Sequence, residues 1–121
     1  MALTIEDCGG QSAAIRTAAQ AACTNLGTIT DNDLRNCIQE QCNDGTIECE
    51  NNCRTGKLGY AYRFTFFWLF TIYKFKTIHL CLNNIRRASI SDIILHEWAH
   101  TCCWDHGDGN GVPGNNGIIP N

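Results

Sequence analysis

The chain has 121 residues, of which 44% are hydrophobic, 17% are charged and nine are cysteines, and its formal net charge is −3. This length accommodates one compact domain and excludes a multidomain enzyme, while the cysteine density argues against an ordinary protein of the reducing cytosol. A negative net charge provides no bulk attraction to nucleic acid, so no nucleic-acid partner is expected.

Charge is distributed unevenly along the chain. Residues 1–58 carry four basic and eight acidic side chains, residues 59–90 carry five basic and no acidic ones, and residues 91–121 carry four acidic and no basic ones. We therefore predict a single domain with four successive parts. These are a Cys-rich helical layer at 1–58, strands at 59–83, a helix at 89–103, and a Gly- and Asn-rich loop and tail at 104–121.

Two helices are predicted in the first part of the chain. Residues 11–26 are rich in alanine, with Ser12 as the expected N-cap and Gly27 as the stop. Residues 31–43 begin with capping residues and place apolar side chains at helical spacing before an Asp-Gly turn.

The cysteines predict a disulfide framework with one thiol left over, because their number is odd. Spacing alone does not fix the pairing, but we interpret the group at 37, 42, 49 and 53 as cross-links within the helical layer. A structural zinc site formed by this group is the alternative, although its spacings differ from the usual zinc knuckles. A further hypothesis pairs Cys81 with Cys102. The candidates for disulfides are Cys8, Cys23, Cys37, Cys42, Cys49, Cys53, Cys81 and Cys102.

This disulfide chemistry predicts a secreted or otherwise extracytoplasmic protein. Residues 1–10 contain neither a basic segment nor a continuous apolar stretch, so no export signal is recognised there. We expect a leader or a larger delivery module to lie outside this chain. The apolar run at 64–73 has ten residues, too few for a membrane-spanning helix, and no membrane association is expected.

Residues 60–82 predict strands, because they contain no Gly, Pro, Asn or Asp and are dominated by β-branched and aromatic side chains. The aromatic residues alternate, which predicts a short aromatic-rich antiparallel sheet whose aromatic face is buried under the helices. A membrane-inserting hairpin is the alternative, but one hairpin cannot satisfy its edges in lipid without oligomerising. The alternating set is Tyr60, Tyr62, Phe64, Phe66, Trp68 and Phe70.

The helix predicted at 89–103, capped by Ser89 or Ser91, carries the motif HExxH. Residues four apart on a helix project to nearly the same side, so His96 and His100 can share one metal ion while Glu97 lies beside them. A third histidine, His106, follows ten positions after His96 and can complete the ligand set.

The eleven residues HEWAHTCCWDH resemble the HExxHxxGxxH signature of the metzincin zinc peptidases, within the broader zincin group. This resemblance implies that His96, His100 and His106 bind Zn²⁺. It also implies that Glu97 is the catalytic base, which activates a zinc-bound water to hydrolyse a peptide bond. The order of a strand followed by the metal helix is similar to that of zincins, so a disulfide-stapled, zincin-like α+β fold is expected.

Two departures from the signature leave the third ligand open. Cys103 occupies the position of the family's glycine, which permits a sharp turn, and the Met-turn of the family is absent because the only methionine is Met1. Cys103, Asp105 and Asp108 are therefore kept as alternative ligands or as groups that orient a histidine.

The function predicted from the sequence is a zinc metallopeptidase acting on a peptide or protein substrate, bound by β-augmentation along a strand edge. It could be a secreted enzyme or a bacterial toxin or effector domain, with an inhibitor or immunity protein as a possible partner. The sequence does not determine the oligomeric state. The alternatives are a disulfide-rich binding module with structural zinc and a membrane-active toxin that uses the aromatic hairpin.

Overall fold

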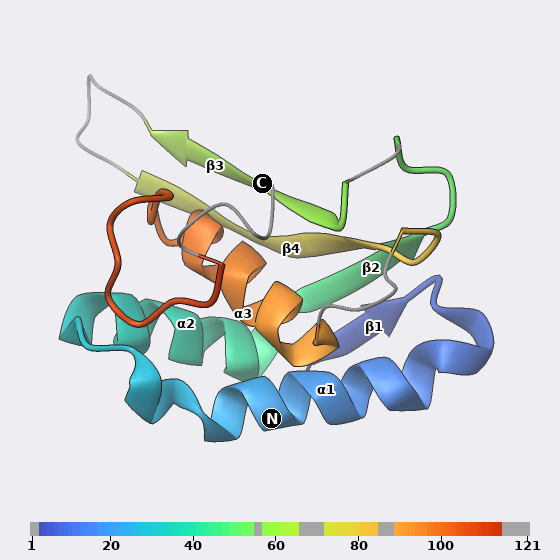
Figure 1. Cartoon of the computed structure of the whole chain (residues 1–121), viewed down its shortest axis with the longest axis horizontal. Coiled ribbons are helices and arrows are strands. Elements are labelled where there is room, and N and C mark those ends of the chain that lie inside the picture. The colour runs from blue at the N-terminus through green and yellow to red at the C-terminus, as the bar shows by residue number, and fades with distance from the viewer. Residues whose placement is uncertain (1–2, 55–56, 66–71, 85–88, 115–121) are drawn as a thin grey trace.

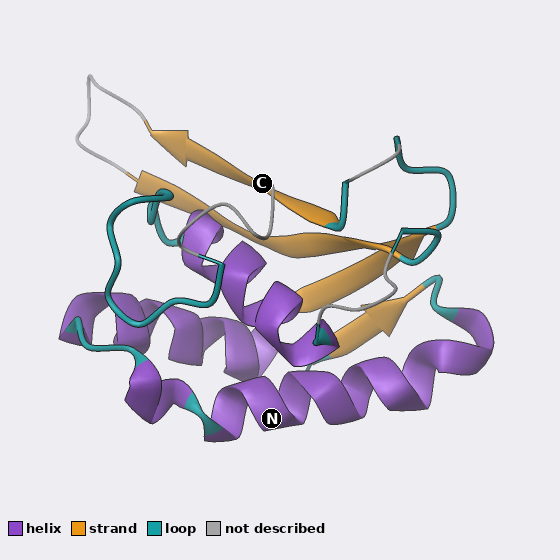
Figure 2. Ribbon diagram, viewed as in Figure 1, coloured by secondary structure: helices purple, strands orange, loops and turns teal. Residues whose placement is uncertain are grey.

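The computed structural model describes residues 3–54, 57–65, 72–84 and 89–114, and excludes the side chains of 62–65 and 72–75. Within these ranges, three α-helices lie on one side of a four-stranded sheet (Figures 1 and 2). This arrangement confirms a small α+β domain. The elements in chain order are β1 (Thr4–Glu6), η1 (Gly9–Gln11), α1 (Ser12–Thr24), η2 (Leu26–Thr28), α2 (Asn32–Asp44), β2 (Thr46–Glu50), β3 (Gly59–Thr65), β4 (Ile72–Cys81) and α3 (Ile90–Thr101).

Both N-terminal helices form close to their predicted bounds. The Asp31 carboxylate accepts a hydrogen bond of 2.8 Å from the amide of Leu34 and so caps α2. The prediction of Ser12 as the N-cap of α1 is wrong, because Ser12 is the first helical residue and Gln11 is the N-cap. The Ser12 hydroxyl donates to the carbonyl of Gly9 over 2.9 Å. Helix α1 ends at Thr24, and a separate 3₁₀ turn continues to Thr28.

The sheet is mixed, not antiparallel as predicted. Its strand order is β1-β2-β4-β3, in which β1, β2 and β4 are parallel and only β3 is antiparallel. The sequence prediction missed β1 and β2 because they are short, with three and five residues. Their shared Thr-Ile-Glu tripeptide aligns in register with Thr-Ile-His of β4. Ile47 of β2 and Ile78 of β4 are fully buried beneath the helices.

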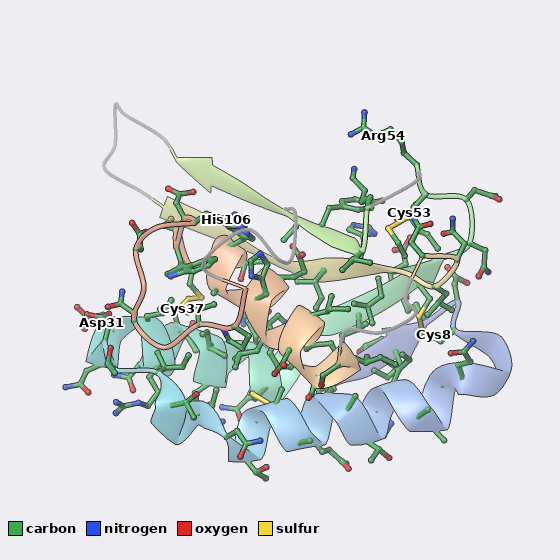
Figure 3. All side chains as sticks on the ribbon, viewed as in Figure 1. Cys8, Asp31, Cys37, Cys53, Arg54 and His106 are labelled. Atoms are coloured by element: carbon green, nitrogen blue, oxygen red, sulfur yellow. A yellow bond between two sulfur atoms is a disulfide. The ribbon has the colours of Figure 1, made fainter. Side chains whose placement is uncertain are left out.

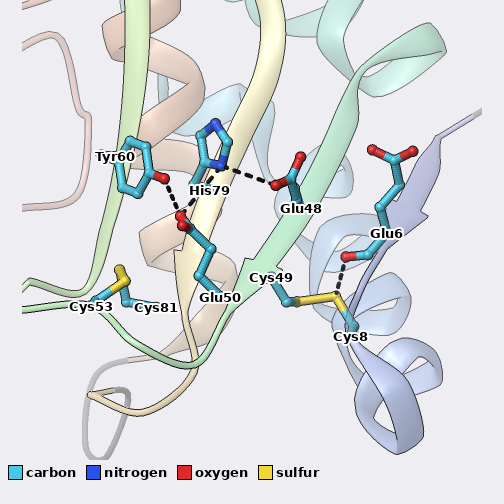
Figure 4. Close-up of polar contacts among 9 residues, drawn as sticks. All are labelled: Glu6, Cys8, Glu48, Cys49, Glu50, Cys53, Tyr60, His79 and Cys81. Atoms are coloured by element: carbon cyan, nitrogen blue, oxygen red, sulfur yellow. Dashed lines mark hydrogen bonds and ion pairs between the residues drawn. A yellow bond between two sulfur atoms is a disulfide. The ribbon is translucent and has the colours of Figure 1, made fainter.

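The predicted burial of the aromatic face is wrong for Tyr60, the only aromatic side chain of the 60–82 segment in the described part of the chain. Tyr60 pairs with His79, and their rings stack with centroids 4.2 Å apart on the face opposite the helices. The Tyr60 hydroxyl donates to Glu50, and His79 Nδ1 lies 3.9 Å from a carboxylate oxygen of Glu48 (Figure 4). Period-two alternation identifies residues that share a face, but does not identify which face the helices cover.

All eight candidate cysteines form disulfides, but the one pair proposed from the sequence, Cys81–Cys102, does not form. The bonds are Cys8–Cys49, Cys23–Cys42, Cys37–Cys102 and Cys53–Cys81, and the remaining thiol belongs to Cys103. The group at 37, 42, 49 and 53 therefore does not cross-link itself. Each member pairs elsewhere, which leaves no thiolate for the structural zinc site considered as an alternative.

The hypothesis that Cys81 pairs with Cys102 is wrong because of the direction of α3. This helix runs back along the sheet from the end of β4, and its 12 residues span about 18 Å, so Cys102 lies far from Cys81 (Figure 1). Cys102 instead links α3 to α2 through Cys37. The four disulfides indicate an oxidising, extracytoplasmic environment.

No helix in the described ranges is long and apolar enough to cross a membrane. The membrane-inserting hairpin considered from the sequence includes residues 66–71, which lie outside the described part of the chain.

Candidate metal centre

The centre is built on α3, which is buried on nearly every side between the sheet and the other helices. Asp92 lies in its first turn, where a carboxylate is favourable at the positive end of the helix dipole. Ser89 occupies the N-cap position as predicted, but its hydroxyl contacts the Ser91 hydroxyl at 2.8 Å and makes no capping hydrogen bond. Burial of α3 leaves both His96 and Glu97 with 0% of their surface exposed.

Three imidazoles converge at the C-terminal end of this helix. The Nε2 atom of His96 lies 3.0 Å from Nε2 of His100 and 3.0 Å from Nε2 of His106. One ligand nitrogen from each ring lies within 4.8 Å of the others, so the group could hold a metal ion. His96 is buried, His100 is half-buried and His106 is exposed, which gives the group an open side.

Main-chain carbonyls fix the tautomers of the two helical histidines. Nδ1 of His96 lies 2.7 Å from the carbonyl oxygen of Pro113, and Nδ1 of His100 lies 2.9 Å from that of Trp104. A carbonyl can only accept, so each Nδ1 carries the hydrogen and each neutral ring presents the lone pair of Nε2. Ligand histidines are held in this way in metal sites.

This donor set fits zinc. Two Nε2 lone pairs that face each other at 3.0 Å repel unless a positive charge lies between them. A tetrahedral zinc ion with Zn–N bonds of about 2.0–2.1 Å places its nitrogen ligands about 3.3 Å apart. The two distances from His96 Nε2, both 3.0 Å, are close to this value, and all three ligand nitrogens lie within 4.8 Å of one another.

A turn after α3 brings His106 back to the helical histidines. Cys103, at the position of the glycine in the resembling signature, has φ of 67° and therefore takes the left-handed conformation that glycine would favour. The following glycines at 107, 109 and 111 also have positive φ. The side chain at 103 is thus accommodated with local backbone strain, and the turn still forms.

Distant residues hold the loop that follows. The amide of Thr30 donates to the carbonyl of Asn110 over 2.9 Å, and a Cβ at Gly111 would overlap the carbonyl oxygen of Thr28. Val112 is buried next to this contact. The loop therefore rests on η2 and the residues after it, and this contact places Pro113 beside His96.

The alternative ligands named from the sequence do not join the three histidines. Cys103 and Asp108 line a separate cavity of about 260 Å³, together with Asp31 and Asp33. The Asp108 carboxylate accepts a hydrogen bond of 2.8 Å from the amide of Asp105 and so stabilises the turn that carries His106. His106 and Asp31 are labelled in Figure 3. Within the described residues, the group that could hold a metal consists of the histidines alone.

The carboxyl group of Glu97 lies between α3 and the start of β3. A Cβ built on Gly59 would be 3.3 Å from Glu97 Oε2, 3.2 Å from its Cγ and 2.8 Å from the carbonyl oxygen of His79. The absence of a side chain at Gly59 therefore makes room for Glu97. The role of Glu97 as the catalytic base stays a prediction.

Sequence reasoning missed three contributors to the centre: Trp104, Pro113 and Gly59. Trp104 could have been found from the sequence, since it is an aromatic residue between two predicted ligands. The carbonyl of Pro113 could not, because every residue has a main-chain carbonyl and the sequence does not indicate which one accepts a hydrogen bond. The fourth histidine, His79, lies on the outer face of the sheet and takes no part in the group (Figure 4).

The chain matches no protein-family model, no curated protein and no solved structure.

Proposed function

We propose that the protein is a zinc-dependent metallopeptidase in which His96, His100 and His106 hold the ion and Glu97 is the catalytic base. The observation that carries the proposal is the convergence of three imidazole Nε2 atoms, two of them in rings whose Nδ1 atoms are engaged by main-chain carbonyls. The resemblance of HEWAHTCCWDH to the metzincin signature, and of the strand-then-helix order to zincins, supports the same assignment.

A catalytic ion is favoured over a structural one by the number of ligands. Structural zinc sites are closed by four protein ligands, whereas three neutral imidazoles leave a coordination position open. Zinc in such a site activates water and polarises a carbonyl group. Four disulfides also cross-link the domain, so we expect its fold to persist when the metal is removed.

In this proposal, Glu97 takes a proton from the attacking water and later donates it to the leaving amine. The carboxyl group is held in place because it is fully buried against Gly59. His96 and His100 keep their Nε2 lone pairs available because Pro113 and Trp104 accept their Nδ1 hydrogens.

A peptide substrate is supported by the position of β3, which lies at the end of the strand order beside β4. An extended peptide could add to this edge through main-chain hydrogen bonds. The edge begins at Gly59, next to the Glu97 carboxyl, so a peptide bound there would pass close to the proposed base. Extracellular proteins or peptides are accessible substrates for a secreted enzyme or a toxin domain in the environment that the disulfides indicate.

Zinc titration of the purified protein, combined with a peptidase assay, tests the proposal. We expect one zinc ion per chain and loss of about 10²–10⁴ in turnover for Glu97→Gln, with zinc affinity retained. Glu40→Gln, on the exposed side of α2, is the matched control and should leave turnover unchanged. Equal cleavage by Glu97→Gln and the unmodified protein would eliminate the base assignment.

Chelation separates the enzyme from a binding module with structural zinc. We expect a chelator to abolish cleavage while the melting temperature falls only slightly, because the disulfides hold the scaffold. Cooperative unfolding on chelation at room temperature would instead favour the structural-zinc module.

A further inference from the structure

We infer that Trp104 is the positioning residue of the metal centre: its indole ring holds all three imidazoles in the arrangement that binds the ion. This inference rests on the proposed metal site. It adds a role for a residue that the signature leaves variable.

The indole ring of Trp104 contacts each histidine of the group. Its centroid lies 5.1 Å from that of His96, 5.1 Å from that of His100 and 5.6 Å from that of His106. The contact with His96 is edge-on, with an interplanar angle of 78°. Trp104 is only 2% exposed, so the histidines lie against a buried and rigid surface.

The main chain and indole nitrogen of Trp104 tie together the two elements that supply the ligands. Its amide donates to the carbonyl of Ala99 in α3 over 3.0 Å, and its carbonyl accepts from His100 Nδ1. Its indole N–H donates to the carbonyl of Gly109 over 3.1 Å, in the loop after His106. The helix and the loop are therefore joined through one residue.

Such a residue matters because three imidazoles that point their lone pairs at one another repel unless a cation lies between them. Imidazole nitrogens with lone pairs facing each other at 3.0 Å would separate by side-chain rotation if space allowed. The indole ring contacts all three imidazoles and so restricts their rotation, and His106 is the most exposed of the three. Preorganisation of this kind raises affinity because less ordering remains to be done on binding.

Three variants test the inference. Trp104→Ala removes the ring but keeps the main-chain carbonyl, and Trp104→Phe keeps an aromatic ring but loses the bond to Gly109. Trp98→Phe is the matched control, since Trp98 lies in α3 beside the helical histidines and is likewise buried, with 0% exposed. Among the described residues, Trp98 has neither a hydrogen-bond partner for its indole nitrogen nor a ring contact with the three histidines.

We expect Trp104→Ala to raise the Kd for zinc, measured by competition with a chromophoric chelator, by about 10–100-fold. The Co²⁺-loaded variant should lose the intense visible absorption of four-coordinate cobalt. Trp104→Phe should show a smaller change of about two- to tenfold, and it provides the measurement if Trp104→Ala fails to fold. Trp98→Phe should lower thermal stability while the Kd stays within about twofold of the unmodified protein.

A second readout uses the protein without metal. Long-range ¹H–¹⁵N spectra should show His96 and His100 as single Nδ1–H tautomers in the unmodified protein. In Trp104→Ala they should show tautomer mixtures, because rings that are free to rotate leave the main-chain carbonyls that accept their Nδ1 hydrogens. Zinc affinity and tautomers both unchanged in the Trp104 variants would overturn the inference. If the unmodified protein binds no zinc but the tautomers still respond to Trp104→Ala, the proposed function fails and the positioning role of Trp104 stands.

Discussion

The two halves of the metal centre are held by different means. Helix α3 presents His96 and His100 through its own hydrogen bonds and periodicity, in the most buried part of the domain. The loop from 102 to 114 presents His106 through positive-φ turns and through contacts with residues some 80 positions earlier in the chain. The comparison teaches that a spacing motif encodes the helical half by itself, whereas the loop half depends on the rest of the fold.

The largest difference between the halves should appear when a ligand is removed. His96 lies 3.0 Å from both other ligand nitrogens, so His96→Ala should weaken zinc binding most. A binding free energy of about 10 kcal/mol shared by three ligands gives about 3 kcal/mol each, on the order of a hundredfold in Kd. His106→Ala should raise the Kd for zinc less than His96→Ala does, because water can replace an exposed ligand. A larger loss for His106→Ala in competition titrations would reverse the comparison.

The helical half also depends on the sheet, through Gly59. A methyl group there would come within 2.8 Å of the His79 carbonyl oxygen and 3.3 Å of Glu97 Oε2, so Gly59→Ala should displace the carboxyl group. We expect kcat to fall by up to about a hundredfold with little change in zinc affinity, since misplacement by about 1 Å has this effect. Gly27→Ala, where a methyl group would meet nothing within 4 Å, serves as the control and should retain full kcat.

The loop half can be disturbed without touching a ligand. Gly111→Ala forces a methyl group into the Thr28 carbonyl and should move Pro113 away from His96, raising the Kd for zinc by about tenfold. Gly109→Ala shares the positive φ, 74° against 79°, but its methyl group meets nothing within 4 Å. We therefore expect Gly109→Ala to lower the free energy of unfolding without raising the Kd for zinc. Equal zinc affinities in the two variants would show that the rest of the fold does not position the loop.

The smallest effect is expected at Cys103, where the two halves join. Its φ of 67° disfavours a side chain, so Cys103→Gly should be more stable than Cys103→Ala by about 0.5–1 kcal/mol. Both variants remove the thiol, which isolates the contribution of the backbone. Urea denaturation measures the difference, and a Cys103→Ala variant of equal or greater stability would contradict a strained turn.

Much of the helical structure could be predicted from the sequence because its determinants are local. Asp31 caps α2, alanine spacing defines α1, and the four-residue spacing of His96 and His100 places both rings on one side of α3. These features involve neighbours within one or two turns. The sequence therefore sufficed to predict that two imidazoles and an adjacent carboxylate share one helix.

The parts that could not be predicted depend on long-range packing. Strands β1 and β2 are too short to stand out, and the disulfide partners of Cys37 and Cys81 follow from the direction of α3 along the sheet. The carbonyl of Pro113 reaches His96 only because the loop rests on the segment after α1. No spacing rule contains that information.

The contact between the loop and residues 28–30 determines whether the motif can be transplanted. Thr28 and Thr30 hold the stretch that carries Asn110 and Gly111, and Cys37 anchors the end of α3 from α2. A synthetic peptide covering 96–106 would carry every proposed ligand but none of these supports. Grafting those eleven residues onto a foreign helix would therefore transfer the helical pair, whereas the third imidazole would lack the contacts that position it here.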